Sequence, residues 1–336
     1  MKYFILGGFS SAFFLYGIAL VYGSTGSTNL SEIVTAFDST IPVDRSEAML
    51  LAGIALVLVG LGFKVAAVPF HVWTPDVYEG APTPVTALLA SVGKAAAFAA
   101  MLRVLVVGFG QYRDDWRPVV WVLAVASLIV GPVLAIVQTD VKRMLAYSSI
   151  NHAGFMLVGL EVAARNAGEA DSGPGVPSVM VYMLAYAVLV VGTFAVVSLV
   201  ARQDDRRTDL DSFRGLGQRH AALALALTVF LVAQAGVPFT SGFIAKFGVI
   251  GGAVDESSYA LAIIAMLSTV IAAFLYLRIM VSAWIQDAPA DDDTSNVTIP
   301  WGSGLAIAAA VAFTLAVGLF PEWLLDVADS TVQFAR

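Results

Sequence analysis

The 336-residue sequence has no cysteine, only three histidines and five lysines, and few charged residues of either sign, 13% in all. Without cysteine the chain can form no disulfide, no thiolate zinc site and no cysteine-ligated iron–sulfur cluster. Five lysines and a net charge of −7 leave no polybasic surface for nucleic acid. Soluble proteins carry roughly 25% charged residues. This chain therefore has too little polar surface to coat a water-soluble particle, and we expect neither a metal nor a cofactor site in it.

Long apolar runs take the place of the missing charges. Hydrophobic residues make up 59% of the sequence, and the mean hydropathy is +0.83. A helix that crosses a bilayer needs about 20 apolar residues, and the runs are too long for the alternating strands of a membrane barrel. We predict an all-α polytopic membrane protein, one membrane domain over residues 1–336 with about nine transmembrane helices. The expected spans are Tyr3–Tyr22, Ala48–Val72, Thr83–Gly108, Pro118–Ile136, Met144–Val162, Ser178–Ala201, Ala221–Ile250, Tyr259–Ile285 and Gly304–Leu325.

The charged residues between the spans predict an orientation. Nine spans put the two termini on opposite sides of the membrane, and the loops on the cytoplasmic side carry the excess of lysine and arginine. Eight such residues fall on the side of Met1 and five on the side of Arg336. We therefore expect Met1 in the cytoplasm and Arg336 outside the cell membrane. The eight are Lys2, Lys142, Arg143, Arg202, Arg206, Arg207, Arg214 and Arg219; the five are Arg45, Arg113, Arg117, Arg165 and Arg336.

Three of the five lysines lie well inside predicted spans: Lys64, Lys94 and Lys246. A lysine at the bilayer centre costs roughly 2.5–3.5 kcal/mol. One interpretation is that these amines reach toward the interface or bond backbone carbonyls. The other is a proton relay, because a buried amine can exchange between its neutral and charged forms. The residue four positions earlier is small in each case, which leaves room for water or allows close helix packing. These small residues are Gly60, Ala90 and Gly242.

Two apolar runs contain a similar interruption. Residues Ala66–Phe70 (AAVPF) resemble Ala235–Phe239 (AGVPF), and Pro69 and Pro238 are 169 positions apart (238 − 69). Proline inside a helix removes a backbone hydrogen bond and breaks it. Paired broken helices in corresponding halves mark the ion path of many transporters. A repeat of residues 1–110 in 118–285 is one interpretation, and chance similarity in an Ala/Val-rich chain is the other.

Two histidines lie where they could exchange protons. His71 follows the first interruption, and His152 closes the string Ser148–His152 (SSINH) early in an apolar span. Imidazole titrates near neutral pH and can pass a proton between two neighbours. A structural hydrogen bond explains either histidine equally well.

Three stretches resemble the antiporter-like membrane subunits of respiratory complex I, the NADH-quinone oxidoreductase. The segment Thr74–Gly80 within the first has the form found in the subunit N type. The other two also resemble multisubunit cation/proton antiporters. The stretches are Gly62–Gly80 (GFKVAAVPFHVWTPDVYEG) with its continuation to Lys94, Lys142–His152 (KRMLAYSSINH) and Gly236–Lys246 (GVPFTSGFIAK).

The resemblance implies two inverted repeats, each with one discontinuous helix, that form linked half-channels. Lys64 matches the lysine of the first broken helix, Lys94 the central lysine, and Lys246 the lysine of the second broken helix. His71 and His152 match positions near the proton entry and relay. The implied activity is proton translocation with other complex I membrane subunits as partners, while NADH and quinone bind elsewhere. A subunit of a multisubunit sodium/proton antiporter is the alternative, and a structural scaffold is a third possibility.

The family pattern also implies about five further helices before the segment that resembles Met1–Tyr22. One of those helices has a glutamate that pairs with the first lysine. The sequence is therefore expected to be a C-terminal portion of such a subunit. No mid-membrane acid is evident in the sequence itself, which agrees with that expectation.

Overall fold

The structure is a computed structural model that describes all residues except 39–46, 168–172, 202–204, 206, 288–298 and 333–336. The described residues form fifteen α-helices and a few shorter helical turns, and the part described contains no β-strand. The α-helices of the first half are α1 Lys2–Thr25, α2 Leu30–Asp38, α3 Glu47–Val65, α4 Thr74–Gly80, α5 Thr83–Leu88, α6 Lys94–Met101, α7 Arg113–Ile136 and α8 Val141–Arg165. Those of the second half are α9 Gly175–Ala201, α10 Leu216–Arg219, α11 Ala221–Ala235, α12 Ser241–Asp255, α13 Tyr259–Trp284, α14 Trp301–Leu319 and α15 Glu322–Val332.

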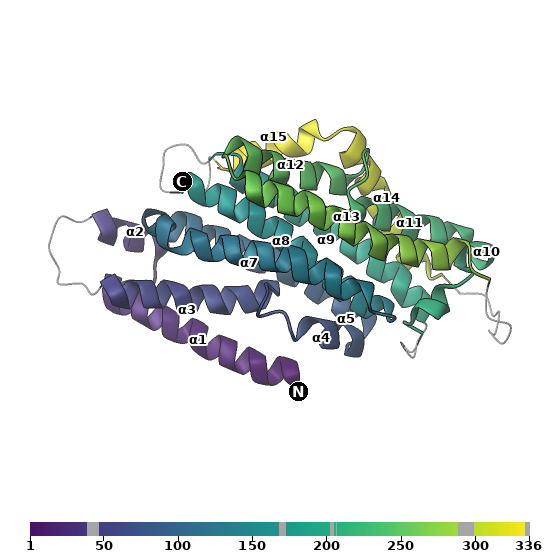
Figure 1. The fold of residues 1–336 in the computed structure, drawn as a ribbon, viewed down its shortest axis with the longest axis horizontal. Helices are drawn as coiled ribbons and strands as arrows, with labels where there is room; N and C mark the ends of the chain where they lie inside the picture. Colours follow the sequence, from purple (N-terminus) through teal and green to yellow (C-terminus); the bar gives the residue numbers. More distant parts are fainter. Residues whose placement is uncertain (39–46, 168–172, 202–204, 206, 288–298, 333–336) are drawn as a thin grey trace.

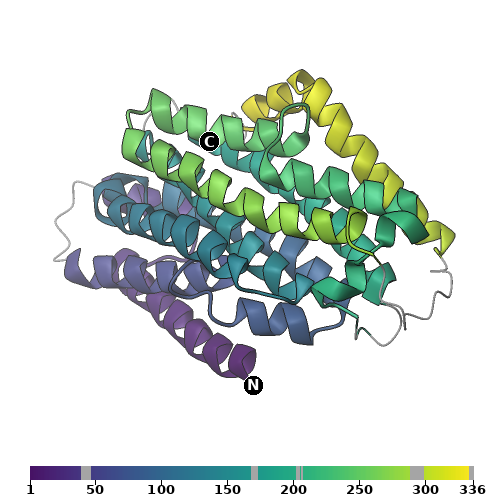
Figure 2. The ribbon, with the colours of Figure 1, turned by 45° about the vertical axis from the view of Figure 1, so that its right-hand side comes forward.

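The long helices run side by side along the long axis of the molecule (Figure 1). Helices α1 and α3 form one edge, and α14 and α15 form the opposite edge, as the turned view in Figure 2 also shows. Helix α8 lies in the middle and packs against α4, α7, α9, α12 and α13. Nearly all of its residues are buried, although it is one of the more polar long helices. A polar helix in the centre of an apolar bundle is where buried chemistry can take place.

The chain is a multi-pass membrane protein by the length and composition of its helices. Among the described residues, seven helices are long and apolar enough to span a bilayer. Of the two other predicted spans, α8 is 25 residues long but carries charges near both ends, and Ala221–Ile250 is divided into α11 and α12, each 15 residues long. Each of the nine predicted regions thus contains helix, two of them with a break, while the exact count of nine spans is not confirmed. The seven are Lys2–Thr25, Glu47–Val65, Thr83–Gly108, Gly110–Ile136, Gly175–Ala201, Tyr259–Trp284 and Trp301–Leu319.

Charged side chains gather at the ends of the helices. At one end Lys2 of α1 and Arg143 of α8 both pair with Asp76 of α4. At the other end Arg165 pairs with Glu161 and donates to the backbone oxygen of Glu256. The starts of α1 and α8 therefore share one end of the bundle, as the predicted topology requires. Arg45, Arg202, Arg206 and Arg336, which contributed to that topology, lie outside the described residues.

Candidate functional site

The first predicted interruption is a break between α3 and α4. Helix α3 ends at Val65, and Ala66 follows with a left-handed φ of 61°. The amide of Val68 donates to the Ser127 hydroxyl of α7 over 3.0 Å. A side chain of a neighbouring helix thus satisfies the backbone that the break exposes, next to Pro69, as irregular backbone within a membrane requires.

The second interruption separates α11 from α12 and holds Lys246. Gly236 caps α11 with a left-handed φ of 89°, and Pro238 follows two residues later. The Lys246 ammonium donates to the Ala235 carbonyl over 3.1 Å, and the side chain is almost fully buried. A Cβ on Gly236 would lie 2.8 Å from Cδ of Lys246. Glycine is therefore needed at this position both for its backbone conformation and for the space that the lysine fills.

Lys94 lies in a continuous helical run that contains two π-helical segments, Leu89–Gly93 and Leu102–Gly108. The first π segment ends directly before Lys94. Such segments re-aim the side chains that follow and are frequent at functional sites. The Lys94 ammonium donates to the Ser149 carbonyl of α8 over 2.7 Å and to the Ser149 hydroxyl over 2.5 Å. Lys94 is 2% exposed, and these two oxygens are its hydrogen-bond partners among the described residues.

Both ring nitrogens of His152 are hydrogen-bonded to tyrosines of other helices. Its Nδ1 lies 2.8 Å from the Tyr182 hydroxyl of α9, and its Nε2 lies 3.1 Å from the Tyr276 hydroxyl of α13. The Tyr276 hydroxyl is in turn hydrogen-bonded to the Ser148 hydroxyl over 2.7 Å. Ser148 and His152 are four residues apart and share one face of α8, whereas Ser149 points to the neighbouring face. One helix therefore presents the imidazole to α9 and α13 and a hydroxyl to Lys94.

Aromatic rings link the two buried lysines to the imidazole. The Lys94 ammonium lies 5.8 Å from the ring centre of Tyr186, which is 4.8 Å from the imidazole of His152. On the other side the imidazole is 6.5 Å from the ring of Phe155, and the Lys246 ammonium lies 4.8 Å from that ring. The structure thus brings three of the predicted residues into one buried row, with His152 between the lysines.

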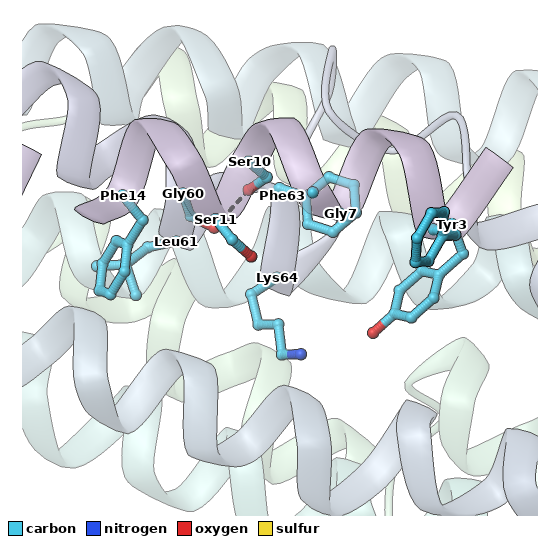
Figure 3. A pocket seen from close by; sticks show the side chains of 11 residues that line it. Tyr3, Gly7, Ser10, Ser11, Phe14, Gly60, Leu61, Phe63 and Lys64 are labelled. Carbon is cyan, nitrogen blue, oxygen red and sulfur yellow. Dashed lines mark hydrogen bonds between the residues drawn. The ribbon is translucent and has the colours of Figure 1, made fainter. Parts of the chain in front are cut away.

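Lys64 does not belong to this row. Its side chain is exposed on the side of α3 that faces α1, at the edge of a cavity of about 570 Å³. Figure 3 shows the amine extending past α1, with the Ser11 hydroxyl on the same side. Among the residues that the structure describes, no hydrogen bond or ion pair to Lys64 is found. Within the described chain Lys64 therefore stands apart from the buried row, and its predicted part in a relay stays a prediction.

His71 lies in the turn after the first break, half-buried, with its Nδ1 lacking a hydrogen-bond partner among the described residues. Its backbone carbonyl accepts from the Thr74 amide and starts α4. The structure does not join its imidazole to the row around His152.

Two of the small residues before the lysines, Gly60 and Gly242, lie in close contact with neighbouring segments. A Cβ on Gly60 would lie 2.5 Å from Cβ of Phe14 on α1. One on Gly242 would lie 1.8 Å from the Ala233 carbonyl oxygen across the break. Of the two interpretations, the structure therefore favours close approach at these positions.

Lys142 has a role that the sequence did not indicate. In the predicted topology it is a loop cation on the side of Met1, yet its side chain is 0% exposed. The ammonium donates to the Ala81 carbonyl over 2.7 Å and to Asp205 over 2.8 Å. Asp205 also accepts from the amide and the hydroxyl of Thr83, at the start of α5. The pair fastens α8 to the helical run that carries Lys94.

Sequence reasoning also missed the tyrosines and serines around the row. Their signal is a polar side chain within an apolar run, which alone does not say where the side chain points. Across the described part of the chain, no three His, Cys, Asp or Glu side chains gather into a candidate metal site. The polar partners of the row are Tyr78, Ser148, Ser149, Tyr182, Tyr186 and Tyr276.

The curated proteins to which the chain is similar include several named as subunit N of NADH-quinone oxidoreductase. The chain is 45% identical to NADH-quinone oxidoreductase subunit N 3 of Streptomyces griseus, over all of this chain and 60% of the relative. It is 44% identical to NADH-quinone oxidoreductase subunit N of Mycobacterium tuberculosis, over all of this chain and 62% of the relative. The chain thus spans about three fifths of the length of these curated relatives.

Solved structures share the fold. A chain of respiratory complex I from Thermus thermophilus with bound aureothin matches with a TM-score of 0.79 and 33% identity, over 97% of this chain and 67% of that chain. A chain of the Mrp complex from Dietzia matches with a TM-score of 0.83 over 97% of this chain and 66% of that chain, a likeness of fold alone at 22% identity. Residues 1–272 match the family described as NADH:quinone oxidoreductase/Mrp antiporter, TM. With its broken helices and its buried lysines, the chain belongs to this family of membrane proteins.

Proposed function

We propose that the chain carries protons through the membrane part of an NADH:quinone oxidoreductase of the complex I type. The observation that supports this function is the buried row of Lys94, His152 and Lys246 along the central helix α8. Relatives at about 45% identity bear the name subunit N of that enzyme. Electron transfer from NADH to quinone takes place in other subunits, and the partners of this chain are other membrane subunits, further antiporter-like ones among them.

Proton transfer uses the contacts of the row. A proton on Lys94 Nζ lies within hydrogen-bond reach of the Ser149 hydroxyl, which bonds Tyr78 over 3.2 Å. The ring of Phe155 separates His152 from Lys246, so that transfer there needs water or a rotation of this ring. Two positive charges about 7 Å apart at an effective dielectric constant near 20 repel each other by about 2 kcal/mol. A proton that arrives at one amine therefore favours release from the next.

Lys64 and His71 form the proposed entry to this path from the side of α1. The Lys64 amine is open to that side, where a side chain of another helix would supply its partner. We further propose that Met1 faces the cytoplasm, that Arg336 faces outward across the cell membrane, and that residues 1–110 and 118–285 are inverted repeats. Similar breaks before Pro69 and Pro238 support the repeat.

Substitution of the lysines in the assembled enzyme tests the function. Lys94→Ala and Lys246→Ala are each expected to lose most of the NADH-driven proton uptake of membrane vesicles, measured per NADH oxidised. Lys64→Ala tests the entry in the same way. Arg103→Ala is the matched control, because Arg103 is an exposed cation on the same helical run as Lys94. Proton uptake that survives in the triple lysine variant would show a scaffold and refute the relay.

The antiporter alternative rests on the family, which also includes Mrp antiporters. It requires a site for sodium, which binds oxygen ligands, and no carboxylate bonds the side chains of Lys94, His152 or Lys246 within the described chain. The two functions differ in what drives them. Sodium uptake by vesicles under an imposed pH gradient, without NADH, would favour the antiporter over the proposed function.

A further inference from the structure

Gln234 is a buried amide that none of the preceding roles uses. It lies on α11, two residues before Gly236, and is 1% exposed. Its Nε2 donates to the Thr193 hydroxyl of α9 over 2.8 Å, and its Oε1 accepts from the Ser148 hydroxyl of α8 over 3.4 Å. The amide therefore ends the hydrogen-bonded chain that begins at His152 and runs through Tyr276.

The number of hydrogens that each group can donate fixes the direction of the hydrogen bonds between Gln234 and His152. A hydroxyl has one hydrogen to donate. Ser148 donates its hydrogen to Gln234, so the bond between Ser148 and Tyr276 is donated by Tyr276. Tyr276 has then spent its hydrogen and can only accept from His152. The neutral imidazole therefore carries its hydrogen on Nε2, and its Nδ1 accepts from the Tyr182 hydroxyl.

We infer that the Gln234 amide sets the tautomer of His152, holding the hydrogen on Nε2 and leaving Nδ1 as the atom that takes up a proton. This inference rests on the proposed role of His152 as a relay and names the nitrogen through which the relay works. An amide with oxygen toward Thr193 and nitrogen toward Ser148 would reverse every bond in the chain and place the hydrogen on Nδ1. The orientation of one side chain on α11 thus decides which face of the imidazole is basic.

The same arrangement closes one route for protons. An amide oxygen is a poor base, so a proton pushed from Nε2 through Tyr276 and Ser148 has no acceptor at Gln234. Protons therefore enter and leave His152 at Nδ1, on the side of Tyr182. Gln234 does not contact the transferred proton, and we describe it as a positioning residue.

Nitrogen NMR of the full chain in lipid bilayers tests the assignment. With ¹⁵N-labelled histidine, at a pH where the ring is neutral, protonated and unprotonated ring nitrogens give separate signals. The signals of His152 are those that His152→Gln removes. Wild type is expected to show one tautomer, with Nε2 protonated. In Gln234→Leu the Ser148 hydrogen is released, and the single-tautomer spectrum is expected to be lost in favour of both forms.

Further variants separate a tautomer effect from a packing effect. Gln234→Glu keeps an oxygen acceptor toward Ser148 and should restore the wild-type spectrum. Ser148→Ala removes the hydroxyl that links Gln234 to Tyr276, and it should give both tautomers of His152 even if Gln234→Leu fails to fold. Ser268→Ala removes a buried hydroxyl of α13 that takes no part in the hydrogen bonds between His152 and Gln234, and it should leave the His152 spectrum unchanged. A wild type protonated on Nδ1, or an unchanged spectrum in both Gln234→Leu and Ser148→Ala, would overturn the inference.

The proposed function can fail separately from this inference. If His152→Gln keeps full NADH-driven pumping, His152 is no relay, whatever the spectrum shows. If pumping is lost but the spectra contradict the expected tautomer, the relay stands and the role of Gln234 does not.

Discussion

The ion pair of Lys142 and Asp205 allows a quantitative prediction, because its two members are unequally buried. The Lys142 side chain is 0% exposed and the Asp205 side chain 26%. At 2.8 Å and an effective dielectric constant near 20, the attraction is about 6 kcal/mol before desolvation is subtracted. Removing one partner of a buried pair costs about 3–5 kcal/mol, because the other charge remains buried without compensation.

The two single variants should therefore differ. Asp205→Ala leaves the Lys142 ammonium buried with only the Ala81 carbonyl, and we expect a loss of about 3 kcal/mol in the free energy of unfolding. Lys142→Met leaves Asp205 with its two bonds from Thr83 and contact with water, so we expect a loss of about 1–2 kcal/mol. The double variant should be more stable than Asp205→Ala, since it no longer buries an unpaired charge.

Unfolding by SDS in mixed micelles, followed by tryptophan fluorescence, measures these differences. Arg214 provides the matched comparison, because its pair with Asp211 is exposed and Asp211→Ala should cost well under 1 kcal/mol. Equal losses for the two single variants of the buried pair, or a double variant whose loss is the sum of both, would refute the reasoning.

Three further predictions concern the second break, the contact of α7 with α8 and the ion pairs of Asp76. Gly236→Ala should lower proton uptake strongly and cost about 1–2 kcal/mol of stability in the same SDS assay, because a left-handed alanine is strained and its Cβ would displace Lys246. Gly131→Ala should cost about 1–3 kcal/mol by forcing α7 from α8, since its Cβ would lie 2.8 Å from a backbone nitrogen of α8; Gly251→Ala, with open space around it, is the control. The pKa of Asp76 lies below its usual value because of hydrogen bonds from Lys2 and Arg143, so the pair's contribution is present above the unfolded pKa of about 3.9 and is lost as the pH falls through the lowered folded value. Asp76→Asn should therefore be slightly less stable than wild type near pH 7 and equal to it at strongly acid pH, and a gap that widens on acidification would contradict this.

The sequence allowed the depth of the lysines to be predicted but not the side of the helix on which they lie. The apolar runs predict that Lys64, Lys94 and Lys246 lie within the bilayer. These helices are apolar all round, so that no polar face indicates which side meets the protein. Lys94, which a π segment directly precedes, contacts Ser149 of α8, and no pattern in its Ala-rich run predicts that segment. Lys64, in a run of the same character, lies on the outer side of α3.

The partners of the site residues could not be predicted from the sequence, because they come from distant segments. His152 was identified from its place in a polar string within an apolar span, yet Tyr182 and Tyr276, which hold it, are 30 and 124 positions away. Lys142 enters the sequence analysis only as a cation on the cytoplasmic side of the predicted topology, and its partner Asp205 is 63 positions away. Neither pairing follows from spacing along the chain, because each depends on how three or four helices pack.

The two breaks look alike in sequence but place their lysines differently, and the direction of side chains along a helix explains why. Side chains lean toward the N-terminus of their helix. Lys246 follows its break, so its side chain leans back toward the break and reaches the Ala235 carbonyl, in the space that Gly236 leaves free. Lys64 precedes its break near the end of α3, so the broken backbone does not lie in the direction in which helical side chains lean, and its exposed side chain lines the cavity beside α1. Lys246 is thus bound to the backbone of its own broken helix, whereas the Lys64 amine, with no hydrogen bond among the described residues, is open to a partner from another helix.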